Sequence, residues 1–373
     1  GSKHVADDQH IGMLQKLGAS DLNGTTNFDR TNYFETVPSN LLETALWLES
    51  DRMGFLLPAM TNEKLRTQKE VVKNERRQGT ETQPYGLAEE RFWQALFPAP
   101  HPYYGAVIGS LEDLEAATDQ DVATFFSTWY RPSNATLAVV GDFEIDEAKA
   151  LIEKYFGTLQ SGPKPEAPVV APAKLSAPIT IEHEETVASL PKIMMGWHTP
   201  ALYAEGDATA DVLSGILSTG RSSRLYKRLV FEKQLAQTVS AYQQSLGAQS
   251  VFTIEAIARP GVTLQQLQTE IDAVLDEVRT KGVSEAEVQR VRNRVQTRAL
   301  NGLQAVGGFG GKSDLLQSYN HFLGEPDRLS WDLARYEAVT PKAVQDFAKQ
   351  LDDTRVILKA TPKASAPAAK EVK

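Results

Sequence analysis

The feature that most constrains the fold is a proline- and alanine-rich segment near the middle of the chain. Residues 161–178 contain five prolines and several alanines, with almost no side chain large enough to bury. This composition is typical of an extended, semi-rigid connection that belongs to no core. The chain of 373 residues is therefore predicted to form two domains, in agreement with a usual domain size of roughly 100–200 residues.

On either side of this segment, the hydrophobic pattern alternates between the strand period and the helix period. On the N-terminal side it predicts strands at 22–27, 32–37 and 135–140, and helices at 5–17, 41–53, 62–78, 87–96, 119–130 and 145–156. On the C-terminal side it predicts strands at 179–183, 192–197, 240–244, 251–258 and 355–358, and helices at 206–217, 264–279, 285–300, 314–323 and 341–351.

A short pattern occurs on both sides. The sequence Thr-x-x-x-Val-x-x-Phe is found at 118–125 and again at 340–347, each time at the start of a predicted helix that precedes a strand. It indicates an internal repeat, although the same spacing is also a common way to begin an amphipathic helix. Strand pairs separated by runs of helices are typical of α+β domains.

The predicted fold class is therefore α+β, with two similar domains, each a mostly antiparallel sheet covered by helices, joined by a Pro/Ala-rich linker. The predicted parts are an N-terminal domain at 1–160, the linker at 161–178, a C-terminal domain at 179–361 and a tail at 362–373. The tail is rich in Lys, Ala and Pro and is expected to be disordered.

Composition excludes several classes of function. The formal net charge of −9 argues against a nucleic-acid partner, since such proteins are usually basic. The chain has no cysteine, which excludes thiol nucleophiles and zinc sites built on cysteine. No apolar run reaches the roughly 18 residues that span a bilayer, so no membrane partner is expected.

A search for catalytic motifs finds none that is complete. No two of the six histidines have the His-Glu-x-x-His or His-x-x-Glu-His spacing that puts two metal ligands on one helical face. The glycine-rich run 307–311 is followed by Lys312 and Ser313, but no strand precedes it. It is interpreted as a flexible hinge between two helices. The residues alone thus indicate a soluble two-domain α+β protein.

Several stretches together resemble the pitrilysin or insulinase (inverzincin) family of zinc metallopeptidases. Their order and spacing match the family over nearly the whole chain, at 17–26, 29–33, 70–75, 101–103, 108–109, 130–135, 140–142, 222–226 and 232–236. The resemblance implies a Zn²⁺ cofactor and hydrolysis of extended or unfolded peptides. The family's His-x-x-Glu-His motif is expected a few residues upstream of Gly1, so the chain is expected to be inactive alone.

The resemblance also assigns roles to single residues. Glu75, in Glu-Val-Val-Lys-Asn-Glu, matches the distal zinc-ligating glutamate, whereas Gln68 stands where some members carry a second, assisting glutamate. Asn23, Gly24, Thr25 and Thr26 match the edge strand that pairs with an extended substrate. The same four residues could equally form an ordinary structural strand.

Two further positions bear on the partners. Val230 and Gln237 stand where the partner half of family enzymes carries an Arg and a Tyr that contact the substrate. The chain therefore resembles the catalytic half, and it is expected to need a second peptidase-family half from the same polypeptide or from another subunit. The alternative is a non-catalytic subunit that binds peptides or assists assembly. The resemblance favours a bacterial periplasmic location.

Overall fold

The computed structural model describes residues 1–363. Their contacts divide the chain into two compact units, each built from three separate segments. Unit 1 comprises 1–74, 109–169 and 297–329, and unit 2 comprises 75–108, 170–296 and the chain from 330 onward. These units cut across the predicted domain boundaries, which stay a prediction. Within the described residues, no helix is both long and apolar enough to cross a membrane.

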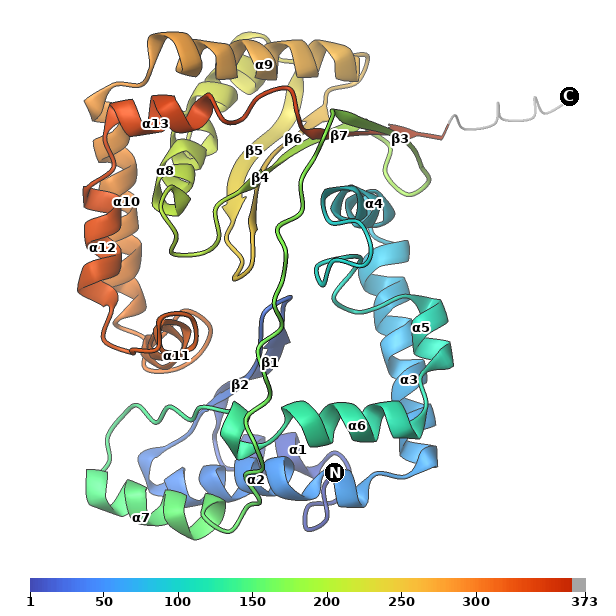
Figure 1. Cartoon of the computed structure of the whole chain (residues 1–373), viewed down its shortest axis with the longest axis vertical. Coiled ribbons are helices and arrows are strands. Elements are labelled where there is room, and N and C mark those ends of the chain that lie inside the picture. Colours follow the sequence, from blue (N-terminus) through green and yellow to red (C-terminus); the bar gives the residue numbers. More distant parts are fainter. Residues whose placement is uncertain (364–373) are drawn as a thin grey trace, which may run out of the picture. The chain divides into compact units, whose positions relative to one another are not determined.

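Unit 2 is built on a five-stranded sheet in the order β3-β7-β4-β6-β5 (Figure 1). The β3–β7 pair is parallel, and the other pairs are antiparallel. The strands are β3 (Ile179–Glu185), β4 (Lys192–Thr199), β5 (Ala236–Gln244), β6 (Ser250–Ala258) and β7 (Val356–Pro362). The helices are α4 (Gly86–Leu96), α8 (Asp207–Ser218), α9 (Leu264–Lys281), α10 (Glu285–Gly302), α12 (Leu329–Glu337) and α13 (Pro341–Ala348), with π-helices at Arg77–Glu81 and Tyr226–Glu232. Residues 297–302 of α10 and Leu329 are grouped with unit 1.

This sheet is covered on both faces, because side chains of a strand alternate between them. On β4, the fully buried Met195 belongs to the core that the strands share with α8, α9 and α13. On the opposite face, α4 approaches β4 at Gly196, where an added Cβ would lie 2.5 Å from Cζ of Phe92. His198 Nε2, on that same face, lies 2.7 Å from the carbonyl oxygen of Leu96. Gly196 therefore permits the close approach of α4.

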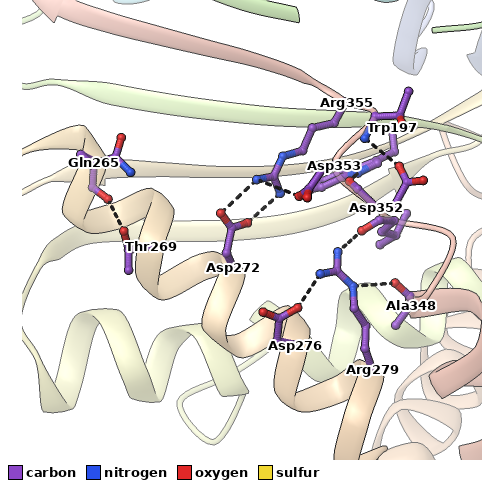
Figure 2. A network of polar contacts seen from close by, with 12 residues as sticks. Trp197, Gln265, Thr269, Asp272, Asp276, Arg279, Ala348, Asp352, Asp353 and Arg355 are labelled. Carbon is purple, nitrogen blue, oxygen red and sulfur yellow. Dashed lines mark hydrogen bonds and ion pairs between the residues drawn. The ribbon is translucent and has the colours of Figure 1, made fainter. Parts of the chain in front are cut away.

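A polar network fixes the start of β7 against α9, as Figure 2 shows. The guanidinium of Arg355, which is 3% exposed, donates two hydrogen bonds to the carboxylate of Asp272, at 2.7 and 2.9 Å. It also stacks over the ring of Trp197, whose indole N–H donates to the carbonyl oxygen of Asp352 at 2.7 Å. Burial of the Arg355 charge is unfavourable by itself, and the two hydrogen bonds to the Asp272 carboxylate compensate for it.

Unit 1 contains one two-stranded antiparallel sheet and several helices. Its strands are β1 (Ser20–Thr26) and β2 (Thr31–Thr36). Its helices are α1 (Gln9–Lys16), α2 (Leu42–Phe55), α3 (Asn62–Arg76), α5 (Leu111–Ala116), α6 (Asp119–Trp129), α7 (Ile145–Phe156) and α11 (Lys312–Leu323), and the last two residues of α3 are grouped with unit 2. Val5, Leu14 and Leu48 form a small core beneath the hairpin, against which Leu22 packs.

The predicted α+β class with mostly antiparallel strands is confirmed, but one predicted strand is wrong. Residues 135–140 form no strand, and Leu137 is 47% exposed. The composition favours a buried strand, yet this segment has no strand partner among the residues described. The carbonyl oxygen of Thr136 accepts a hydrogen bond from the Gln317 side chain at 2.9 Å.

The structure also contains short helices that were not predicted. The helices α5 and α12 and the π-helix Tyr226–Glu232 were missed, since each is short and weakly periodic. The disordered tail was predicted to start at 362. In the structure, Pro362 is the last residue of β7, and the Lys363 amide donates to the Glu185 carbonyl at 2.7 Å. The remainder of the predicted tail lies outside the described residues.

Candidate functional site

The hairpin β1–β2 holds the four residues predicted to bind substrate, Asn23, Gly24, Thr25 and Thr26. Its turn is fixed locally, because the Asn27 side chain accepts hydrogen bonds from the amides of Asp29 and Arg30, both at 2.9 Å. The Asn27 amide in turn donates to the Arg30 carbonyl at 3.0 Å. An Asn that satisfies two amides in this way is a common turn signal. The turn sets the register of both strands.

The register decides which groups of β1 face outward. The pairs are Gly24↔Tyr33, Thr25↔Asn32 and Thr26↔Thr31. Antiparallel pairs alternate between hydrogen-bonded and non-hydrogen-bonded, and the Asn27–Arg30 bond makes Thr26↔Thr31 non-hydrogen-bonded. The N–H and C=O groups of Gly24 and Thr26 therefore point away from β2.

The outer edge of β1 has no strand partner within residues 1–363. The outward amide of Gly24 instead donates to the side-chain oxygen of Asn23 at 2.8 Å. Edge groups that lack a strand partner are a template for an added extended strand, and at Gly24 such a strand would replace the local bond to Asn23. The outer edge of β2 is equally unpaired, so the geometry offers two edges, and the family motif distinguishes β1.

One face of the hairpin lies against α2. The Arg52 guanidinium stacks over the Tyr33 ring, 3.7 Å from its centroid, and is ion-paired with Glu49. The Tyr33 hydroxyl lies 3.2 Å from that of Tyr130. Gly24 leaves room for this ring, since an added Cβ would lie 3.0 Å from Cδ1 of Tyr33.

A buried carboxyl lies on the same face. Burial, together with the neighbouring carboxylate of Glu49, raises the pKa of Glu35 to about 7, although Arg52 opposes the shift. Near neutral pH this side chain is therefore partly protonated. Glu35 is thus a titrating group on β2 itself.

The other face of the hairpin is held by polar contacts. The Thr25 hydroxyl donates to the side-chain oxygen of Asn32. Arg30 Nη1 donates to the Thr25 hydroxyl at 2.6 Å and to the side-chain oxygen of Asn32 at 3.0 Å. The side-chain Nδ2 of Asn32 donates to Asp314 Oδ1 at 3.2 Å, which connects the hairpin to the first turn of α11.

Glu75, the predicted zinc ligand, lies near the end of α3 and is exposed. It takes part in no ion pair within the described part of the chain, whereas its neighbour Arg76 is buried and paired with Glu90 at 2.7 Å. The Glu75 carboxylate is thus available to a ligand. The four β1 residues lie together on one strand, and Glu75 belongs to the other contact unit.

The residues of this chain do not fit a zinc site by themselves. Catalytic zinc requires three protein ligands, and no group of three His, Asp or Glu side chains that could hold a metal occurs in residues 1–363. The histidines have other neighbours: His4 lies 2.5 Å from Asp51, and His10 lies 3.1 Å from the Leu48 carbonyl. Glu75 alone can contribute only one ligand.

Sequence reasoning missed the contacts that brace β1. Arg30 and Asn32 lie inside the quoted motif, but only the fold shows that both contact Thr25. The glycine-rich run 307–311, interpreted above as a flexible hinge between two helices, connects α10 to α11 and also lies against the hairpin. The separation of Asn32 from Asp314 along the sequence leaves no local signal for this contact.

The chain is similar to known proteins over most of its length. Residues 116–295 match the model of a family described as the Peptidase M16 inactive domain. Zinc protease PqqE of Helicobacter pylori is 28% identical over 363 residues, which are 96% of this chain and 80% of that protein. The family match begins at the end of α5 and ends within α10, so it includes neither β1 nor Glu75.

Solved structures show the same architecture. A protease from Helicobacter pylori has a TM-score of 0.88 and 25% identity, and the similarity covers 97% of this chain and 86% of that chain. The first half of the periplasmic protease PqqL from Escherichia coli has a TM-score of 0.75 and 17% identity, with 97% and 80% covered. Of the whole PqqL chain, 41% is covered, so this chain corresponds in fold to one half of that protease.

Proposed function

We propose that this chain, which is similar to M16 peptidases over most of its length, is part of a zinc-dependent metalloendopeptidase that hydrolyses extended or unfolded peptides. Its own contribution is to hold the peptide main chain along β1 and to supply Glu75 as one zinc ligand. The remaining ligands and a second half come from outside the residues described here. On its own, the chain is inactive.

The open edge of β1 is the observation that carries this proposal. The outward N–H and C=O groups of Gly24 and Thr26 can form a ladder with any extended peptide, because main-chain bonds require little of the peptide's sequence. The exposed, polar side chains of β1 cost little to keep in water, so the strand does not need a permanent cover. Such an edge suits unfolded substrates of varied sequence.

Two observations favour an alternative, a non-catalytic peptide-binding or assembly subunit. The matched family model is described as an inactive domain, and no group of three metal ligands exists among the described residues. The exposed Glu75 favours the peptidase, because a purely binding subunit has no use for a free carboxylate at this motif. The periplasm is the proposed compartment, supported by the name of the PqqL neighbour.

Binding to β1 is tested with two matched proline variants. Thr26→Pro removes an outward N–H from β1 without breaking the β1–β2 ladder, and Thr31→Pro does the same on β2. Edge positions whose N–H faces solvent tolerate proline. In fluorescence anisotropy with a labelled unstructured peptide, Thr26→Pro is expected to weaken binding roughly tenfold and Thr31→Pro to leave it unchanged. Equal affinities for all three proteins would refute binding at β1.

The catalytic part is tested by cleavage of a quenched fluorescent peptide library, with and without a chelator. The measurement uses this chain and its full natural reading frame. Chelator-sensitive cleavage by the full frame alone, weakened together with zinc affinity by Glu75→Gln, is the expected result. Absence of cleavage by either protein, even with a candidate second half added, would favour the binding subunit.

A further inference from the structure

The glycine-rich run Gly307-Gly308-Phe309-Gly310-Gly311, here called the glycine loop, has a defined backbone conformation, and none of the sequence motifs gave it a function. Gly308 and Gly310 have φ of +74° and +82°, a backbone region that favours glycine. At Gly311, an added Cβ would lie 2.2 Å from the Gly307 carbonyl oxygen. The glycines thus fold the loop tightly onto itself.

The glycine loop lies against the hairpin. An added Cβ on Gly307 would lie 2.6 Å from the Thr36 hydroxyl, and one on Gly308 would lie 3.6 Å from Asp21. Asp314 fixes the loop from its other side, because its carboxylate accepts hydrogen bonds from the Gly310 amide at 3.0 Å and from Asn32. The loop therefore contacts both strands of the hairpin and is connected to it through Asp314.

Phe309 is the single large side chain of the glycine loop, and it remains 69% exposed. Its ring lies 5.7 Å from the guanidinium carbon of Arg30, which itself donates to the Thr25 hydroxyl. An aromatic ring held in solvent between glycines loses the stabilisation that burial of an apolar side chain would give. An exposed apolar side chain fixed beside a binding edge is typical of a contact surface.

The register of a peptide paired with β1 shows which of its side chains would contact Phe309. A peptide paired with the outer edge of β1 places the residue opposite Thr25 on the Thr25 face. That face carries Asn32, Arg30 and the glycine loop. The residues before and after it in the peptide point to the opposite face, where Tyr33 and Arg52 lie. Alternate peptide side chains thus meet different surfaces.

We propose that Phe309 forms the wall of a subsite for an apolar side chain of the peptide bound along β1, at the position opposite Thr25. This inference rests on the proposed function and makes Phe309 a specificity-determining residue. The preference is apolar because the surface that Phe309 offers is an exposed aromatic ring, which gains most from contact with another apolar side chain. Nη1 of the nearby Arg30 is directed to Thr25 and Asn32.

The test uses the chain described here and labelled unstructured host peptides that carry Phe, Leu, Ala or Asp at one guest position. A second series moves the guest by one residue. In anisotropy titrations, one series is expected to bind roughly five- to tenfold more tightly with Phe than with Ala. Phe309→Ala is expected to reduce that ratio below about twofold, and Phe309→Leu to leave an intermediate ratio.

Phe231→Ala is the matched control, since Phe231 is 72% exposed and lies on the π-helix Tyr226–Glu232 of unit 2. It should keep the full preference, and thermal unfolding should show all variants folded. A Phe preference that persists in Phe309→Ala, or a preference for Asp, would overturn the subsite while leaving the proposed function intact. Absence of binding for every guest peptide would refute the proposed function, and the subsite with it.

Discussion

The strands β4 and β1 differ in burial and in the pairing of their edges. Nearly every residue of β4 is buried, with α8 and α9 on one face of its sheet and α4 on the other. Most residues of β1 are polar and exposed, and its outer edge is unpaired in the part of the chain that the structure describes. A strand such as β4 stabilises the fold through apolar burial. A strand such as β1 contributes little burial, and its main chain stays available for a ligand.

The largest expected effect lies in the unit 2 network of Figure 2. Asp272→Ala leaves the buried Arg355 charge without its bidentate partner and is expected to lower the free energy of unfolding by roughly 3 kcal/mol. Chemical denaturation measures this, and Arg355→Met in the same background should recover most of the loss. Asp346, paired with two exposed lysines, is the control whose replacement by Ala should have no measurable effect.

A pair of glycine substitutions sharpens the comparison between the two sheets. Gly196→Ala forces a Cβ to within 2.5 Å of the buried Phe92 ring, with an expected destabilisation of roughly 2 kcal/mol. Gly24→Ala meets Tyr33, which is 44% exposed and can rotate into solvent, so a loss below about 0.5 kcal/mol is expected. Equal losses in denaturation experiments would contradict the assignment of different roles to these strands.

The hairpin should also make stability depend on pH. The folded-state pKa of Glu35 is raised to about 7 from the usual 4.5, so the folded protein binds a proton that the unfolded chain has released. This contribution to stability is fully present below about pH 4.5 and is lost as the pH rises through about 7, by on the order of 2 kcal/mol between these two values. Glu35→Gln should flatten this part of the curve measured by thermal unfolding. An unchanged slope would show that Glu35 does not titrate in this range.

Unit 2 has a second acid that titrates in a similar way. Burial raises the pKa of Asp211 to about 6, although a hydrogen bond from the Tyr336 hydroxyl opposes the shift. Its contribution to stability should therefore be lost between about pH 4 and pH 6. Asp211→Asn is expected to remove that part of the slope and to leave the part above pH 6, which belongs to Glu35.

How far the sequence predicts the molecule differs between the two units. The strands of unit 2 follow from apolar runs, because buried strands carry their own signal in side-chain composition. In unit 1, the apolar run at 135–140 predicted a strand that does not form, since a strand also needs a partner, which composition cannot supply. Thr118 and Thr340 do cap α6 and α13 as their shared pattern predicted.

The candidate site was predictable only in part. The β1 residues were located by their motif, and a turn around Asp29-Arg30 was predicted between the strands 22–27 and 32–37. The role of the Asn27 side chain in this turn was not predicted. The supporting contacts were not predicted either, because Asp314 and Phe309 come from a distant segment whose glycines resemble those of any flexible linker. Their function depends on φ angles and close approaches that only the fold defines.

The most direct test of the account is residue-resolved amide hydrogen exchange with and without a bound unstructured peptide. The Thr25 amide faces β2, and its exchange should not change. The outward amides of Gly24 and Thr26 should gain roughly tenfold or more protection when peptide is added. Unchanged exchange at both amides, with protection gained elsewhere, would contradict the claim that β1 binds the peptide main chain.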